Sequence, residues 1–223
     1  ESFVDFASKV PFYGSVILCL DDENNADIIP QIEKRIVTYG MATQADIKAD
    51  NIEKKGFTVS FDVSFMGEKK GRVTLNFPGE HNVLNAIGAI AAAYEMNIPF
   101  EVCKEALESF SGVQRRLTVR FDDGSCTVMD DYGHHPTEIK TTLRAIREAY
   151  PDKKIVTVFQ PHRYSRTAVL MKDFTTCFFD ADKLFVSDVY AASEDPIEGA
   201  DSQNLVAGIK QHGFKDVYYI SSF

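Results

Sequence analysis

The chain has few features of secreted or membrane proteins. It contains only four cysteines, Cys19, Cys103, Cys126 and Cys177, and no two of them form a C-x-x-C pair. Isolated thiols in largely apolar surroundings favour buried cysteines in a reducing compartment over a disulfide framework. No signal peptide is visible, and no apolar run reaches the roughly 18 residues that a membrane span needs. We therefore expect a cytoplasmic protein that has no membrane partner.

An excess of positive charge is also absent. The formal net charge is −9, which argues against nucleic acid or anionic membranes as general partners. A phosphate ligand would have to be bound by local arginine, lysine or backbone N–H groups. The 223 residues are 44% hydrophobic and 26% charged, a composition typical of globular proteins with a substantial core. This length fits one large domain or two of ordinary size.

The first half mixes helical and strand periodicity. The chain starts at Glu1 inside an amphipathic helical pattern, so we expect further chain before it. Apolar runs predict strands at 15–20 and 36–40, and helical spacing predicts a helix over 28–35. From 46 to 77 the period changes to two. This predicts an antiparallel hairpin with one solvated face and its turn at 67–71.

The second half has a more regular rhythm. An Ala-rich segment over 82–96 predicts a buried helix, and another helix is expected from Pro99. From Leu117 to Tyr219 the pattern is two strands and then three helix–strand repeats, which is typical of a parallel sheet. We place the domain boundary at Arg116, giving domains 1–116 and 117–223. The predicted fold class is α/β: the end of an α/β domain that carries a β-hairpin, then a smaller Rossmann-like domain with a mainly parallel sheet. The cleft between them is the expected ligand site.

Two polar segments carry most of the candidate chemistry. Residues 130–138 follow an apolar strand at 126–129, and a helix opens at Pro136. Residues 159–167 follow a second apolar strand at 155–158. Open α/β sheets bind ligands at the carboxyl ends of their strands, so both segments should face one crevice. Ordinary polar loops are the alternative. Three histidines and two arginines between the two segments favour a functional site.

Five stretches of the chain resemble the Mur ligase family, in the right order and over essentially the whole length. They are Pro11-Phe12-Tyr13-Gly14, 78–86, 112–116, 130–138 and 159–167. The last two are most similar to the member that adds L-alanine to UDP-N-acetylmuramate. In that reaction of peptidoglycan synthesis, ATP phosphorylates the muramoyl carboxylate and the amine of L-alanine attacks the acyl phosphate. The alternative is the sister ligase that attaches a recycled murein tripeptide, which is less similar around 160–163.

The family's P-loop, G-x-x-x-x-G-K-[ST], has no match in these residues, and Gly67–Lys70 is predicted to be a hairpin turn. The resemblance therefore implies a fragment: the end of the P-loop-type central domain, then a C-terminal domain that stops early. The implied cofactors are ATP and Mg²⁺, with the Mg²⁺ ligands expected mainly in the missing N-terminal part; no metal ligand is assigned here. A catalytically silent binding module is the alternative for this chain alone, and a homo-oligomer is left open.

The resemblance implies nucleotide contacts from both predicted domains. Asn85 would read adenine with its amide, which both donates and accepts, and it would need a partner in a buried helix. His81 and Asn82 would assist, although Asn82 could simply cap its helix. Arg116 would bind the γ-phosphate, with a surface ion pair as the alternative. Asp131 would bind the ribose.

Substrate contacts are implied in the two polar segments. Tyr132 and His134 would line the muramoyl and amine site, and His134 would also transfer the proton of the attacking ammonium. His162, Arg163 and Arg166 would clamp carboxylate and acyl phosphate.

The same segments leave alternatives open. Arg163 and Arg166 could instead form ordinary salt bridges with Asp173 or Asp131. The roles of three neighbouring residues remain undecided at this point: Asp130, His135 and Asp188.

Overall fold

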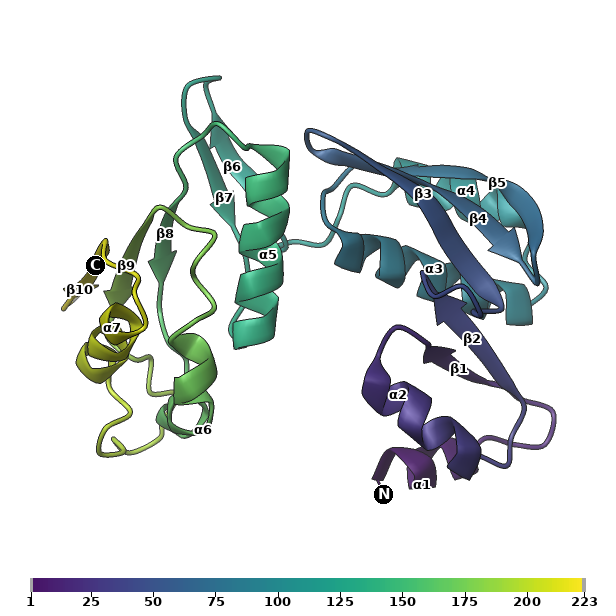
Figure 1. Cartoon of the computed structure of the whole chain (residues 1–223), viewed down its shortest axis with the longest axis horizontal. Helices are drawn as coiled ribbons and strands as arrows, with labels where there is room; N and C mark the ends of the chain where they lie inside the picture. Colours follow the sequence, from purple (N-terminus) through teal and green to yellow (C-terminus); the bar gives the residue numbers. More distant parts are fainter. Residues whose placement is uncertain (1, 222–223) are drawn as a thin grey trace. The chain divides into compact units, whose positions relative to one another are not determined.

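The computed structural model describes residues 2–221, and the chain separates into two compact units (Figure 1). The first unit runs to Gly112 and the second begins at Val113. Both are α/β, in agreement with the predicted fold class. No helix in the described part of the chain is long and apolar enough to cross a membrane.

The first unit is built on one mixed sheet with the strand order β1-β2-β3-β4-β5. The strands are β1 (Val16–Cys19), β2 (Ile36–Gly40), β3 (Ile47–Lys55), β4 (Thr58–Phe65) and β5 (Glu68–Leu75). Neighbours β1, β2 and β3 run parallel, whereas β3, β4 and β5 are antiparallel. The sheet therefore changes from parallel to antiparallel pairing at β3.

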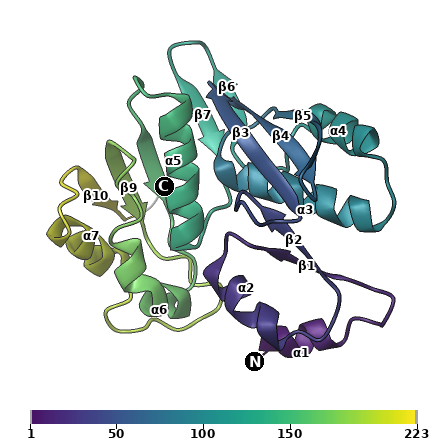
Figure 2. The same ribbon diagram turned by 45° about the vertical axis from the view of Figure 1, so that its right-hand side comes forward.

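Helices pack on this sheet, as Figure 2 shows for α3 and α4. The helices are α1 (Ser2–Ser8), α2 (Glu23–Ile28), the 3₁₀ turn η1 (Ile29–Gln31), α3 (Glu80–Glu95) and α4 (Phe100–Ser109). Ile87 and Ile90 of α3 are buried against alternate residues of the strands, among them Val59 and Phe61. The apolar residues of the period-two strands and of the Ala-rich helix α3 thus pack in one core. The helices predicted over 82–96 and from Pro99 are confirmed as α3 and α4.

Two predictions for this unit were wrong in detail. The helix expected over 28–35 lies earlier, because the Asp22 carboxylate accepts hydrogen bonds from the N–H groups of Asn24 and Asn25 and begins α2 there. Pro30 then stands in the short η1 turn, and 32–35 are not helical. The expected hairpin is a three-stranded meander whose second turn is at 66–67. Many residues of β3 and the start of β5 are charged, and this composition concealed their strand character.

Asp62 of β4 is a buried acid with three donors. Its carboxylate accepts hydrogen bonds from Lys69 Nζ at 2.8 Å, Asn51 Nδ2 at 3.0 Å and Arg72 Nη1 at 3.1 Å. Hydrogen bonding by Lys69 and then Asn51 lowers the pKa of Asp62 to about 2. Near neutral pH the folded antiparallel sheet therefore contains Asp62 in its ionised form.

The pH dependence of unfolding should report this carboxylate. The folded-state pKa lies below the ordinary value of 3.8, so the stabilisation is present above pH 4 and is lost as pH falls from about 4 to 2. Asp62→Asn should lower the free energy of unfolding at pH 7 and flatten its change over that interval, measured by urea unfolding at several pH values. Asp5→Asn, at an exposed position of α1, is the control. An unchanged pH profile in Asp62→Asn would contradict the assignment.

The described residues of the second unit form two separate sheets. Strands β6 (Thr118–Asp122) and β7 (Thr127–Asp130) form an antiparallel pair. Strands β8 (Val156–Phe159), β9 (Lys183–Ser187) and β10 (Val217–Ile220) form a parallel sheet with the order β10-β9-β8. The helices are α5 (Pro136–Ala149), α6 (Tyr164–Phe174) and α7 (Ser202–Gln211). This confirms the predicted succession of elements, but β7 is not a strand of the parallel sheet.

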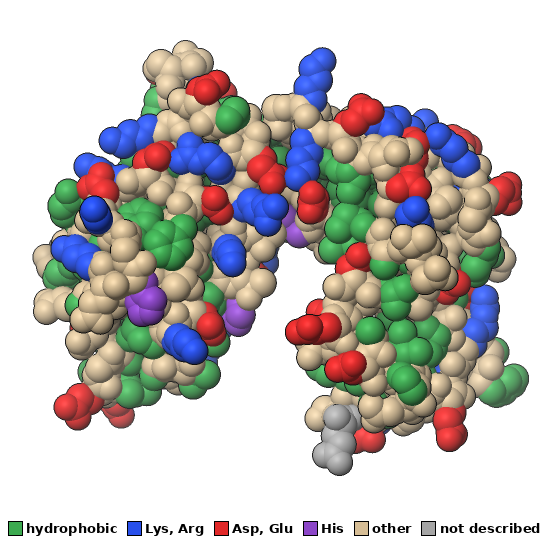
Figure 3. Space-filling model, in the orientation of Figure 1, with side chains coloured by type: hydrophobic (Ala, Val, Ile, Leu, Met, Phe, Trp, Pro, Cys, Tyr) green, Lys and Arg blue, Asp and Glu red, His purple; other side chains and the backbone are tan. Residues whose placement is uncertain are grey.

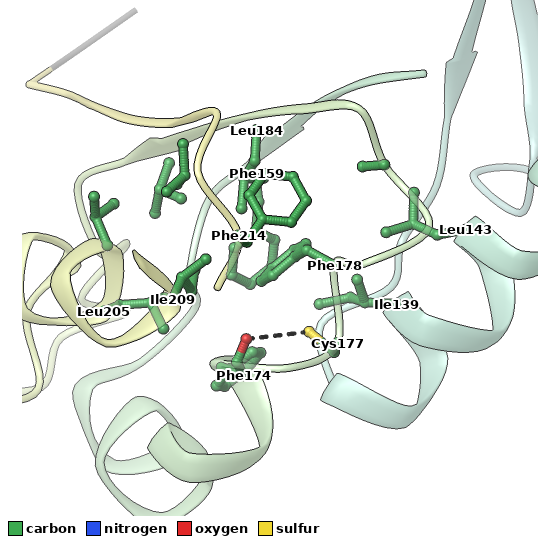
Figure 4. Packing of buried hydrophobic residues seen from close by; sticks show 14 of the residues in the cluster. Ile139, Leu143, Phe159, Phe174, Cys177, Phe178, Leu184, Leu205, Ile209 and Phe214 are labelled. Atoms are coloured by element: carbon green, nitrogen blue, oxygen red, sulfur yellow. Dashed lines mark hydrogen bonds between the residues drawn. The ribbon is translucent and has the colours of Figure 1, made fainter. Parts of the chain in front are cut away.

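All three helices contribute to one core against the parallel sheet (Figure 4). The ring of Phe159 lies 5.6 Å from that of Phe174 and 5.3 Å from that of Phe178. Burial raises the pKa of the Cys177 thiol to about 12, so this cysteine is inert. The prediction of buried thiols holds for Cys177, whereas Cys126 is exposed.

The parallel sheet of the second unit has an outer face with apolar side chains. Val156 and Val158 of β8 are 52% and 54% exposed, and they alternate with residues that point into the core. In Figure 3, hydrophobic side chains are visible at the surface of each unit among charged ones. Parallel sheets are usually covered on both faces, so the described residues supply only one of the two covers.

Candidate functional site

The loops after β8 and β9 are bonded to each other. Arg163 N donates to Tyr190 O at 2.8 Å, and Tyr190 N donates to Pro161 O at 2.8 Å. These bonds form an isolated parallel bridge between His162 and Tyr190, whose rings lie 5.2 Å apart. Gln160 Nε2 also donates to Asp188 O at 3.3 Å. The carboxyl ends of these two parallel strands therefore form one rim.

His162, Arg163 and Arg166 come together at this rim. Arg163 is the N-cap residue of α6, and Arg166 lies in its first turn. Arg166 Nη1 lies 3.4 Å from His162 O and 3.5 Å from His162 Nδ1. Desolvation, and then the positive charges of Arg166 and Arg163, lower the pKa of His162, and His134 adds to this effect only when its ring is protonated. His162 is consequently a neutral hydrogen-bonding group near pH 7, placed between cations.

Helix α5 begins within segment 130–138 and helix α6 within segment 159–167, and the two helices contact each other. The expectation that both segments follow strands of one parallel sheet was wrong, because among the described residues β7 pairs only with β6. The start of α5 nevertheless places His134 close enough to act electrostatically on His162. Tertiary packing, rather than a shared sheet, joins the two segments.

His135 has a structural role at the start of α5. Its Nδ1 accepts a hydrogen bond from Thr137 N at 3.2 Å. The Glu138 carboxylate accepts from His135 N at 3.2 Å and from His134 N at 3.1 Å. These bonds form a capping box, which satisfies N–H groups that the first helical turn leaves unpaired. The sequence His-Pro-Thr-Glu carried this signal, with an acid three residues after the cap.

His134 and Tyr132 form an accessible pair. Their rings meet edge to face at 5.2 Å, and Tyr132 is 50% exposed. The Arg115 guanidinium lies 4.8 Å from the Tyr132 ring centroid. His134 Nδ1 is 3.0 Å from Tyr132 O, and a carbonyl can only accept. In the neutral ring, Nδ1 therefore carries the proton and Nε2 has a lone pair available for a proton.

Asp131 and Arg116 are engaged within the second unit. Asp131 accepts hydrogen bonds from Leu117 N at 3.0 Å and Gly133 N at 2.7 Å. Arg116 Nη2 lies 3.1 Å from Glu138 Oε1, which is the surface ion pair considered as an alternative. The carboxylate therefore organises the chain on both sides of the β6–β7 hairpin, and a ligand role for either residue requires these contacts to change or to be shared.

Three neighbouring acids have internal partners. Asp130 pairs with Arg120 at 3.0 Å, and Asp188 accepts from the Tyr219 hydroxyl at 2.6 Å. The acid beside Arg163 is Glu194, at 3.7 Å, so the expected alternative of pairing with Asp131 or Asp173 was wrong for Arg163 among the described residues. Glu194 and Tyr219 were missed from the sequence, because each reaches its partner across about thirty residues and no local pattern marks them.

The other nucleotide candidates lie on α3 of the first unit. Asn85 is exposed, so the expectation that it needs a partner inside a buried helix was wrong; the buried face of α3 is formed by Val83, Ala86, Ile87, Ile90 and Ala91. Asn82 is not the cap either. The helix begins at Glu80 after Gly79, which has a φ of 102°, and Asn82 Nδ2 donates back to Pro78 O at 2.7 Å. His81 is half-buried in the first turn.

The described residues offer no group of three or more His, Cys, Asp or Glu side chains that could hold a metal ion. The acids near the site instead accept hydrogen bonds from backbone N–H groups or from the Tyr219 hydroxyl, or pair with arginine.

Comparison with known proteins matches this architecture to one family. Residues 1–93 match the Mur ligase middle domain, and residues 115–223 match the Mur ligase, glutamate ligase domain. The chain belongs to the Mur ligase family. It is 50% identical over 220 residues to a UDP-N-acetylmuramate–L-alanine ligase of Pelobacter propionicus, covering 99% of this chain and 48% of that relative. The chain thus spans about half the length of the curated relatives it matches.

Solved structures agree with this relationship. The UDP-N-acetylmuramate–alanine ligase of Thermotoga maritima aligns with a TM-score of 0.69 at 29% identity, over 83% of this chain and 39% of that one. The murein peptide ligase of Psychrobacter arcticus aligns with a TM-score of 0.65 at 26% identity, over 99% of this chain and 46% of that one. Sequence identity is therefore higher to the proteins named as alanine ligases.

Proposed function

We propose that this chain is part of an ATP-dependent ligase that joins L-alanine to the muramoyl carboxylate of UDP-N-acetylmuramate in peptidoglycan synthesis. The observation that carries the proposal is the cluster of His162, Arg163 and Arg166 with His134 nearby, in a chain 50% identical to a relative with that name. The domains we assign are the end of the central ATP-binding domain, 1–116, and the C-terminal domain, 117–223. A cytoplasmic location fits these substrates.

The chemistry explains why such a cluster is needed. ATP phosphorylates the muramoyl carboxylate, the alanine amine attacks the resulting acyl phosphate, and phosphate leaves as the amide forms. Carboxylates and phosphates meet at one point, so cations must offset their charge. Arg163 and Arg166 offer planar guanidinium groups that can bind a carboxylate through two hydrogen bonds each.

The imidazoles have a different role in this proposal. The alanine amine must lose its proton before it can attack, and the free Nε2 of His134 is a suitable acceptor. Neutral His162 can donate or accept a hydrogen bond at the rim without adding charge. Tyr132, exposed beside His134, offers an apolar ring and a hydroxyl to the muramoyl group.

ATP would be bound by Asn85, His81 and Asn82 of α3, with Arg116 and Asp131 from the second domain. The exposed amide of Asn85 fits the donor and acceptor edge of adenine. Mg²⁺ would neutralise phosphate charge, with its ligands supplied mainly by parts of the protein outside this chain. Arg116 would exchange its contact with Glu138 for the γ-phosphate.

The Asn85 assignment predicts a selective loss of nucleotide binding. In the full-length enzyme, Asn85→Ala should raise the KM for ATP about fivefold or more, the effect of losing one polar contact. The KM for L-alanine should stay near its original value. Because Asn85 is exposed, Tm should not fall. Steady-state kinetics and thermal unfolding test this together, and an unchanged KM for ATP would contradict the adenine contact.

The proposed reaction is tested by phosphate release from full-length protein supplied with ATP and UDP-N-acetylmuramate. Release should depend on L-alanine and should produce the alanine amide, detected by mass spectrometry. Dependence on the murein tripeptide instead of L-alanine would favour the sister ligase, to which the Psychrobacter arcticus structure corresponds by name. Phosphate release that depends on neither L-alanine nor the murein tripeptide would contradict both proposals.

A further inference from the structure

Glu194 joins the loop after β9 to the first turn of α6. Its Oε2 accepts a hydrogen bond from Ser165 N at 3.0 Å, and its Oε1 accepts from Ser165 Oγ at 2.8 Å. The N-cap residue Arg163 makes no side-chain capping bond. Glu194 therefore supplies, from a distant loop, the acceptor that the start of a helix requires.

The same carboxylate faces Arg163. Glu194 Oε1 lies 3.7 Å from Arg163 Nη1, and the two side chains are 25% and 51% exposed. Hydrogen bonds from Ser165 N and Ser165 Oγ, together with the charge of Arg163, lower the pKa of Glu194. The carboxylate is consequently ionised near pH 7 and attracts a long, half-exposed guanidinium that would otherwise sample many conformations.

The backbone around this contact is unusual. Arg163 has a φ of 71°, and Ala192 and Ser193, immediately before Glu194, have φ values of 49° and 68°. Residues other than glycine seldom adopt these values, and they persist where surrounding contacts enforce them. The turn is closed by Glu194 N, which donates to Ala191 O at 3.0 Å. The backbone conformation of the loop therefore fixes the position of Glu194.

We propose that Glu194 is a positioning residue that holds the Arg163 guanidinium at the rim, beside His162, to receive the carboxylate of the amino-acid substrate. Ser165 anchors Glu194, and Glu194 in turn restricts Arg163. The inference rests on the proposed function, because it assigns Arg163 to the L-alanine carboxylate. It adds a residue from the loop after β9 that would act on the substrate only through Arg163.

Glu194→Gln in the full-length enzyme tests the inference. The amide oxygen of glutamine still accepts from Ser165 N, so the helix start is retained while the charge facing Arg163 is lost. The KM for L-alanine should rise about three- to fivefold, the scale of a partly exposed charge pair. The kcat, the KM for ATP and Tm should change little. Glu198→Gln, at an exposed position in the same loop, is the matched control and should leave all four values unchanged.

A double-mutant cycle makes the test sharper. If Glu194 acts through Arg163, Glu194→Gln should have no further effect on the KM for L-alanine once Arg163 is alanine. Equal effects in both backgrounds would overturn the inference, because Glu194 would then act on the loop alone.

The remaining outcomes separate this inference from the proposed function. Wild-type protein without alanine-dependent phosphate release would contradict the function itself and the positioning role with it. An active wild type with an unchanged KM in Glu194→Gln would overturn only the positioning role. A lower KM would also overturn it, since Glu194 would then compete with the substrate carboxylate for Arg163.

Discussion

Replacing Arg163 or Arg166 by alanine in the full-length enzyme is expected to lower kcat/KM for L-alanine at least about tenfold. A lost charge-assisted hydrogen bond costs on the order of 1.5–3 kcal/mol. A group that also stabilises charge in the transition state can contribute roughly 100-fold in rate. Both side chains lie at the start of α6 beside His162, where anionic substrates are proposed to meet. Steady-state kinetics of the two variants provide the measurement.

Controls separate this loss of function from a loss of fold. Arg163→Lys and Arg166→Lys keep the charge but lose the planar fork, so they should recover only part of the activity. Arg144→Ala removes a 67% exposed arginine from α5 and should leave the kinetics unchanged. Tm should move little in all variants. Near-normal kinetics in both alanine variants, or activity lost only through unfolding, would show that the clamp assignment is wrong.

The chain by itself, residues 1–223, is expected to show no ligase or ATPase turnover. Cradling the β- and γ-phosphates of ATP requires a nest of backbone N–H groups and a lysine, and no G-x-x-x-x-G-K-[ST] segment is present in this sequence. Phosphate release with ATP, UDP-N-acetylmuramate and L-alanine should therefore stay at background.

Full-length protein assayed in the same way is the positive control. Binding can be measured separately on the chain, by titration with ADP. Detectable ADP binding without turnover would fit a nucleotide-contacting part of a longer ligase. Alanine-dependent phosphate release above background from the pure chain would instead show that the phosphate-binding machinery lies within these residues.

Local pattern was enough for most elements of the second unit. The apolar runs at 126–129 and 155–158 became β7 and β8, and Pro136 begins α5 because proline is well suited to the first turn of a helix. Local pattern failed at 28–35, where Asp22 begins α2 early. It also missed β3, because many of its residues are charged and one face of the antiparallel part is only partly covered.

For the candidate site, too, local sequence pattern predicts some features and the geometry of the fold shows others. From the sequence alone we predict His134, His162, Arg163 and Arg166 as site residues, because these groups follow apolar strands in short segments whose composition suits anionic ligands, and this assignment stays a prediction. It left the role of His135 undecided between function and structure, and the geometry of the capping box with Glu138 shows a structural role.

The sequence by itself determined the class of elements, their order and the family, because periodicity, helix caps and short motifs are local properties of the chain. Only the tertiary structure decided which strands pair and which side chains contact each other. It placed β7 outside the parallel sheet and turned Asn85 to the surface. It also brought Glu194, in the loop after β9, to Ser165 in the first turn of α6. The physical reason is that a long-range hydrogen bond or ion pair depends on how separate elements pack, and no spacing along the chain encodes that distance.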